Sequence, residues 1–133
     1  MSSGIEITVD LSGYDRVLRE EPIKAGRLLS AGAERAITIM KTSFNTSPAG
    51  RIHQRGTRTH TASQPGYPPN IDTGALSNSL RWEEAGQSTR KIFGMEYGLE
   101  LEDSTMKNRP FIQPAFDQLK NEFPGMAKAY LTL

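Results

Sequence analysis

The chain has 133 residues, of which 36% are hydrophobic, and a formal net charge of +1. This composition predicts one domain with a thin core, which favours burial of further surface in an oligomer. Because the chain contains no cysteine, disulfide frameworks and thiolate metal sites are excluded. No apolar run approaches the roughly 20 residues that span a bilayer, and residues 1–6 lack the features of a signal peptide. We therefore expect a protein of a cytosol-like compartment, without membrane contact.

Charges of opposite sign are separated along the chain. Residues 35–71 contain no acidic side chain, whereas residues 92–106 contain four acidic side chains and no lysine or arginine. Such segregation permits head-to-tail association, because the basic part of one copy can meet the acidic part of the next. The alternative is that both stretches are simply solvated.

The first half of the chain predicts a strand and a long helix. Apolar and polar residues alternate over residues 5–11, which is the period of a half-buried strand. Residues 14–21 predict a short helical turn. Over residues 22–44, apolar side chains recur at steps of three and four, which predicts a helix with one buried face.

Residues 48–70 contain four prolines, three glycines and no apolar periodicity. Ordered loops of this length are uncommon inside compact domains, so we predict an extended, mobile arm. Arg51, Arg55 and Arg58 in this arm suit phosphate contacts, because each arginine releases counterions on binding. The near-neutral total charge and the lack of a groove-recognition motif argue against nucleic acid. The partner of the arm stays open between nucleic acid, acidic protein surface and solvent.

The second half of the chain predicts a short helix and a hairpin. Asp72 or Thr73 is expected to cap a helix that includes residues 75–80, because its side-chain oxygen can accept an amide of the first turn. Residues 80–84 and 91–95 predict an antiparallel hairpin, with Trp82 as a core or interface anchor.

A second long helix is expected to begin at Pro110. Its apolar face carries Phe111, which we expect to anchor the helix in the core, and Pro124-Gly125 is expected to kink or interrupt it. Arg109 is expected to staple the nearby acidic turn. Together these elements predict an α+β fold, in which the long helix and the C-terminal helix pack on a small, mainly antiparallel sheet with a long extended loop.

No arrangement of residues indicates catalysis, a cofactor or a metal. His53 and His60 are the only histidines, and no carboxylate lies between them, so a metal site is not expected. No serine lies in a nucleophile elbow and no glycine pattern predicts a phosphate-binding loop. Residues 83–84 and 100–103 could supply paired carboxylates for acid–base catalysis, but acidic residues on strand edges and turns are far more often plain surface. We expect a protein that is not an enzyme.

Three segments resemble one known family. Residues 68–80 resemble the Asp-Thr-Gly-x-Leu-x-x-Ser-apolar signature of tail-completion or head–tail joining (neck) proteins of long-tailed double-stranded DNA bacteriophages. Residues 97–105 are similar to that family's Tyr-Ala-x-x-apolar-Glu-x-Gly-Thr element, with Ser104 where the family has glycine. Residues 109–115 resemble its Arg-Pro-Phe entry into the C-terminal helix. The positions that carry the motifs are Asp72, Thr73, Gly74, Leu76, Arg109, Pro110 and Phe111.

The resemblance covers nearly the whole chain, although the arm is longer than the family's usual link. It implies a structural virion protein that is assembled in the host bacterial cytoplasm. Copies would form a homo-oligomeric ring in the neck, which joins or completes the head–tail connection. The implied partners are neighbouring neck and tail proteins, with at most non-specific contact with the axial DNA. The alternatives are a tail terminator that caps the tail tube, and a nucleic-acid-binding module that uses the basic arm.

The charge segregation also predicts an assembly interface for such a ring. Contacts between neighbours in a ring are heterologous, so two different surfaces of the chain must meet. We expect the arm of one subunit to lie against the acidic turn of the next. The residues expected in this interface are Arg51, Arg55, Arg58, Glu100, Glu102 and Asp103.

Overall fold

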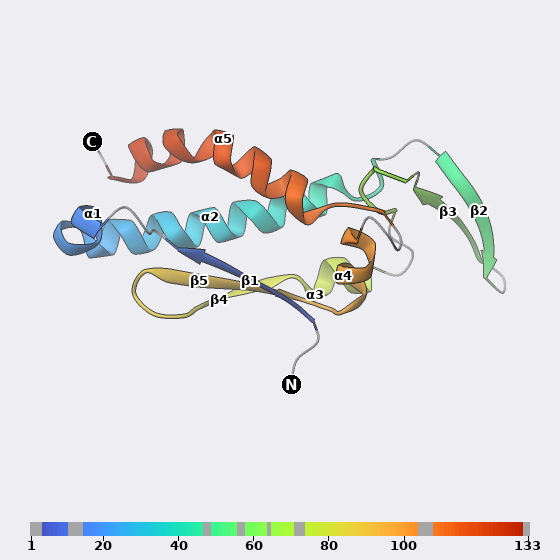
Figure 1. The fold of residues 1–133 in the computed structure, drawn as a ribbon, viewed down its shortest axis with the longest axis horizontal. Helices are drawn as coiled ribbons and strands as arrows, with labels where there is room; N and C mark the ends of the chain where they lie inside the picture. Colours follow the sequence, from blue (N-terminus) through green and yellow to red (C-terminus); the bar gives the residue numbers. More distant parts are fainter. Residues whose placement is uncertain are drawn as a thin grey trace.

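Two long helices lie over one face of a three-stranded antiparallel sheet, and a separate two-stranded hairpin projects from one end (Figure 1). This arrangement confirms the predicted α+β fold. The computed structural model describes residues 4–10, 15–46, 49–55, 58–63, 65–70, 74–103 and 108–131.

The three-stranded sheet has the order β1 (Ile5–Asp10), β5 (Thr89–Gly94), β4 (Arg81–Glu84), so β1 and β4 are its edges. Both neighbouring pairs are antiparallel. Alternation along β1 buries Ile5 against the helices and exposes Thr8 on the opposite face, which is the half-buried pattern expected of this strand. The predicted β4–β5 hairpin is confirmed.

Helix α2 (Pro22–Ser43) follows a short helix, α1 (Asp15–Glu20), as the sequence predicts. Pro22 occupies the first turn of α2, where its missing N–H costs no hydrogen bond. The buried face of α2 packs on β5 and on α5 (Ile112–Leu131). Its buried residues are Ala25, Leu28, Leu29, Gly32, Ala33, Ala36, Ile37, Ile39 and Met40.

Helix α5 begins at Ile112, two residues after Pro110, and continues through Pro124 to Leu131. The predicted interruption at Pro124 is therefore wrong. Pro124 has no N–H to donate to the carbonyl of Lys120, but both residues are exposed, so water can satisfy that carbonyl. Continued burial of Leu131 against the other helices holds the last turns in place.

Two short helices lie at the end of the sheet where the hairpin projects, α3 (Ala75–Ser79) and α4 (Tyr97–Glu102) (Figure 1). Gly74 precedes α3 with a φ of +78°, a left-handed conformation that glycine adopts without steric cost. The predicted cap by Asp72 or Thr73 lies outside the described residues.

The hydrophobic core has two clusters along the α2–α5 pair. The larger cluster contains Phe111, which is completely buried, and its ring meets that of Phe44 edge-on at 5.3 Å between centroids. The predicted anchoring role of Phe111 is thus matched by its position. The smaller cluster lies at the opposite end of the helices and consists of Ala25, Leu28, Leu29, Ala127 and Leu131.

The expected long loop instead contains two paired strands, β2 (Ala49–Arg55) and β3 (Arg58–Ser63). The prediction of a segment without regular structure is therefore wrong for these residues. Apolar periodicity could not reveal the strands, because their sequence is mostly polar and they pair only with each other. The predicted mobility of the arm stays a prediction.

Candidate assembly interface

The β2–β3 hairpin gathers basic positions on one face. Its antiparallel register places Arg55 opposite Arg58 and His53 opposite His60. Because side chains alternate between the faces of a strand, these four positions share one face. Like charges directly opposite each other are unfavourable in a sheet. The register thus places two arginine positions directly opposite each other.

Arg109 fastens the base of the hairpin to the body. Its Nε donates a hydrogen bond to the carbonyl of Ser63 at 3.1 Å, and its backbone N–H donates to the carbonyl of Leu101 at 2.6 Å. Ser63 is buried, and Gly66 N–H donates to the carbonyl of Asn108 at 2.7 Å. The backbone of Arg109 thus contacts Leu101 beside the acidic turn, and its side chain holds the base of the hairpin, a contact that the sequence did not indicate. The predicted stapling of the acidic turn by the Arg109 side chain stays a prediction.

Glu102 caps helix α5 of its own chain. Its carboxylate accepts hydrogen bonds from the backbone N–H groups of Phe111 and Ile112, both at 2.8 Å, and of Gln113 at 3.0 Å. These amides have no partner within the helix, and the positive end of the helix dipole lies beside the carboxylate. Glu102 therefore has a structural role within its own chain, and its expected place in an intersubunit contact stays a prediction. Glu100 is half-buried and Asp103 exposed.

The surface of α4 combines acidic and apolar side chains. Met95, Tyr97 and Leu99 are 37%, 46% and 44% exposed, three of the six large exposed hydrophobic residues in the described chain. Glu96 is also exposed, and Glu100 is half-buried. These exposed apolar side chains are close together in the sequence and stand beside acidic ones, which makes the segment a candidate for contact with another surface.

A groove of about 740 Å³ separates the first half of α2 from β4. The indole N–H of Trp82, at its wall, donates to a carboxylate oxygen of Glu34 at 2.6 Å. Trp82 is half-buried, so its exposure does not decide between the two predicted roles, an anchor in the core or an anchor in an interface.

Arg90 forms the floor of this groove and is only 4% exposed. Its guanidinium donates to the carbonyls of Gly26, Gly86 and Thr89 and to the hydroxyl of Ser30, at 2.9 to 3.2 Å. These acceptors compensate the cost of burying the charge. Arg90 therefore ties the β4–β5 turn to α2, which sequence reasoning missed.

A second groove of about 520 Å³ runs between the edge strand β1 and helix α5. Its polar rim includes Thr8 and Asp10 from β1 and Asp117 and Lys120 from α5. Its apolar lining consists of Val9, Phe116, Leu119, Phe123 and Pro124. Unlike the first groove, it has no buried charge at its floor among the described residues.

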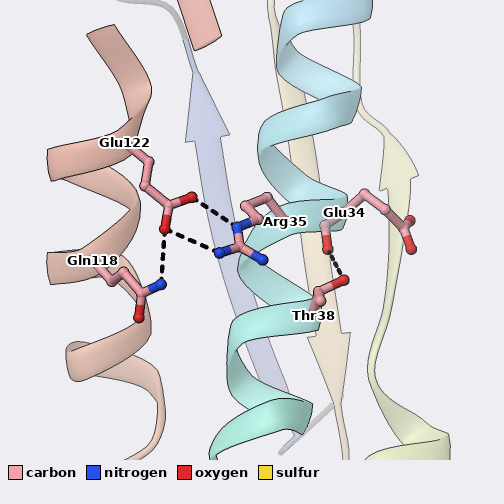
Figure 2. Close-up of polar contacts among 5 residues, drawn as sticks. All are labelled: Glu34, Arg35, Thr38, Gln118 and Glu122. Carbon is pink, nitrogen blue, oxygen red and sulfur yellow. Dashed lines mark hydrogen bonds and ion pairs between the residues drawn. The ribbon is translucent and has the colours of Figure 1, made fainter. Parts of the chain in front are cut away.

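Arg35 of α2 and Glu122 of α5 form an ion pair across the helix interface, with Nε and Oε1 2.7 Å apart (Figure 2). Gln118 donates a further hydrogen bond to the same carboxylate at 2.8 Å. The bond from Arg35 and then that from Gln118 lower the pKa of Glu122 from 4.5 to about 2, and Glu122 in turn raises the pKa of Arg35. The neighbouring Glu34 points away from this pair (Figure 2).

The lowered pKa predicts a specific loss of stability in acid. The contribution of ionised Glu122 is complete above its unfolded-state pKa of 4.5 and disappears as the pH falls toward about 2. Urea unfolding midpoints should therefore differ between wild type and Glu122→Gln near neutrality and converge across this window. Arg35→Met should lose the larger share of this pH-dependent part, because the hydrogen bond from Gln118 to Glu122 remains. A difference that stays constant through the window would contradict a stabilising role of the ionised carboxylate.

The described part of the chain contains no group of three or more His, Asp or Glu side chains able to hold a metal ion. Among its helices, none is long and apolar enough to cross a membrane. Comparison with known proteins found no matching family model, no matching curated protein and no matching solved structure.

Proposed function

We propose that this protein is a structural subunit of the neck of a long-tailed bacteriophage, in which copies form a ring that joins or completes the head–tail connection. The observation that carries the proposal is that one chain presents two unlike surfaces. A hairpin with a basic face projects from the body, while the body presents acidic and apolar surfaces. Unlike surfaces suit heterologous contacts, which close into rings. The resemblance of the three motif segments supplies the phage context.

The motif residues support an architectural role. Leu76 and Phe111 lie in the core, Gly74 begins α3 in a left-handed conformation, and Arg109 holds the hairpin base. Each of these residues stabilises the body from which the hairpin projects. A protein that acts through its surfaces needs such a rigid body, and we propose that it catalyses no reaction.

A second candidate function is contact with nucleic acid, favoured by the basic hairpin face. Arginines at the directly opposing positions 55 and 58 suit the phosphate backbone, which binds basic surfaces irrespective of sequence. This alternative predicts that the purified protein binds double-stranded DNA, with an affinity that falls steeply as salt rises.

The test of the neck assignment is deletion of the gene from the phage that carries it. Electron microscopy should show filled heads and separate tails of normal length, and wild-type protein supplied in trans should restore joined particles. A chain in which Arg51, Arg55 and Arg58 are changed to glutamate should fold but fail to restore them. Joined particles in the deletion strain would contradict the proposal. Tails of uncontrolled length would instead identify a tail terminator.

A further inference from the structure

Among the residues that the structure describes, strand β1 has a neighbouring strand on one side only. It is an edge strand of six residues, and the apolar groove beside it lies between Val9 and helix α5. An edge strand presents backbone N–H and C=O groups that can pair with another strand. A strand added there would place alternate side chains over the groove and the others on the solvent face of the sheet.

The β2–β3 hairpin has little support from the rest of the described chain. Its strands contact each other and make few contacts with other elements of the described chain, and an isolated two-stranded hairpin is marginally stable in water. The register of β2 is irregular between Ala49 and Ile52, which disturbs its outer edge. Strand β3 is regular and contains Thr59 and Thr61, whose branched side chains favour strands. The better edge for further pairing is therefore β3.

The faces of β1 and β3 are complementary. On β1, Glu6, Thr8 and Asp10 are exposed on the face away from the helices, where Glu6 also accepts a hydrogen bond from Lys91 of β5 at 2.9 Å. On β3, the period of two places the positions of Arg58 and His60 on one face and the two threonines on the other. If β3 is added beside β1, either of its two faces could lie over the apolar groove. The face with position 58 would bury an arginine there, and an unpaired buried charge is costly. The face with positions 59 and 61 is therefore the favoured one. That orientation sets the basic positions beside the acidic residues of β1.

Two other pairings are less favourable. Strand β4, the other edge, has only four residues, and its solvent face carries one basic and one acidic side chain, Arg81 and Glu83, so it offers less length and less negative charge than β1. Pairing within one chain is disfavoured because the hairpin projects away from the sheet, and Arg109 holds its base beside α4 (Figure 1).

We infer that β3 of one copy pairs with the β1 edge of a second copy, so that the three-stranded sheet continues across the subunit boundary. The hairpin then becomes part of a five-stranded sheet, in which positions 59 and 61 of β3 fall on the face of the β1–α5 groove. This inference deepens the proposed ring assembly, on which it rests, by naming the two elements that meet.

The absence of cysteine allows a direct test by cross-linking the purified full-length protein at high concentration. The test variant Thr8→Cys/His60→Cys places one thiol on each proposed partner strand. The control Glu83→Cys/His60→Cys uses the opposite edge, since Thr8 and Glu83 both pair with Lys91 on the same face. A short bismaleimide tolerates a small shift in register. Circular dichroism establishes that both variants are folded.

We expect the test variant to form a ladder of covalent oligomers at least about tenfold faster than the control, because pairing raises the effective concentration of the two thiols. Equal rates, a faster control, or no ladder in either variant would overturn the strand pairing. The gene deletion separates the two proposals. A preferential ladder together with intact particles would remove the neck assignment alone, whereas separated heads and tails without a ladder would remove the strand pairing alone.

Discussion

Phe111→Ala is expected to lower the free energy of unfolding by about 3–5 kcal/mol, as truncation of a buried aromatic side chain does. The side chain is completely buried, so its loss leaves a cavity as well as lost apolar contact. Its ring also meets Phe44 edge-on, a favourable aromatic geometry that alanine cannot replace. Urea unfolding followed by circular dichroism measures the effect.

Phe116→Ala is the matched control for this substitution. Phe116 lies in α5, a short distance after Phe111 in the sequence, and is half-buried, so its truncation should cost clearly less. A loss below about 1 kcal/mol for Phe111→Ala would contradict the anchoring role, since surface substitutions have effects of that size.

Glu102→Ala is expected to cost about 2–3 kcal/mol, because hydrogen bonds to charged groups contribute about 1.5–3 kcal/mol. One carboxylate serves three amides at the start of α5, and its removal leaves them without that acceptor. Glu102→Gln should recover part of the loss, since the amide oxygen still accepts a hydrogen bond. The same urea experiment measures both variants.

Glu100→Ala removes a carboxylate from the same short helix and serves as the control. Glu100 is half-buried like Glu102, but no hydrogen bond joins it to α5 among the contacts described. Equal losses for Glu100→Ala and Glu102→Ala would show that the cap is not what stabilises the helix. The comparison also matters for assembly experiments, since reversal of all acidic residues in 100–103 would disturb the fold through Glu102.

The long helices could be predicted because their burial is one-sided and continuous. In α2 the apolar steps begin directly after Pro22 and end near Phe44, so local pattern and tertiary packing agree. The alternation in β1 is equally direct. The β2–β3 strands could not be found in this way, because a hairpin that covers no core has no apolar period. Their pairing is visible only in the register of the backbone.

The candidate site was less predictable, because its important contacts join residues distant in sequence. Arg90 resembles any strand arginine until Gly26 and Ser30, some sixty residues earlier, are brought to its guanidinium. In the sequence, Glu102 looks like one more residue of an acidic turn. Its role is decided by the backbone N–H groups from which its carboxylate accepts hydrogen bonds, nine to eleven residues later in the chain. The signal available was an acidic residue shortly before a helix whose first turn lacks its own cap.

The division of the core into two clusters gives the helix pair two unequal ends. Phe111 and Phe44 fix one end through large buried side chains, whereas the other depends on small and aliphatic groups such as Ala127 and Leu131. Pro124 lies between them and removes one backbone hydrogen bond from α5. We therefore expect amide hydrogens in the terminal turns of α5 to exchange faster than those beside Phe111. The end of the molecule that carries the hairpin would then be the slower of the two to open.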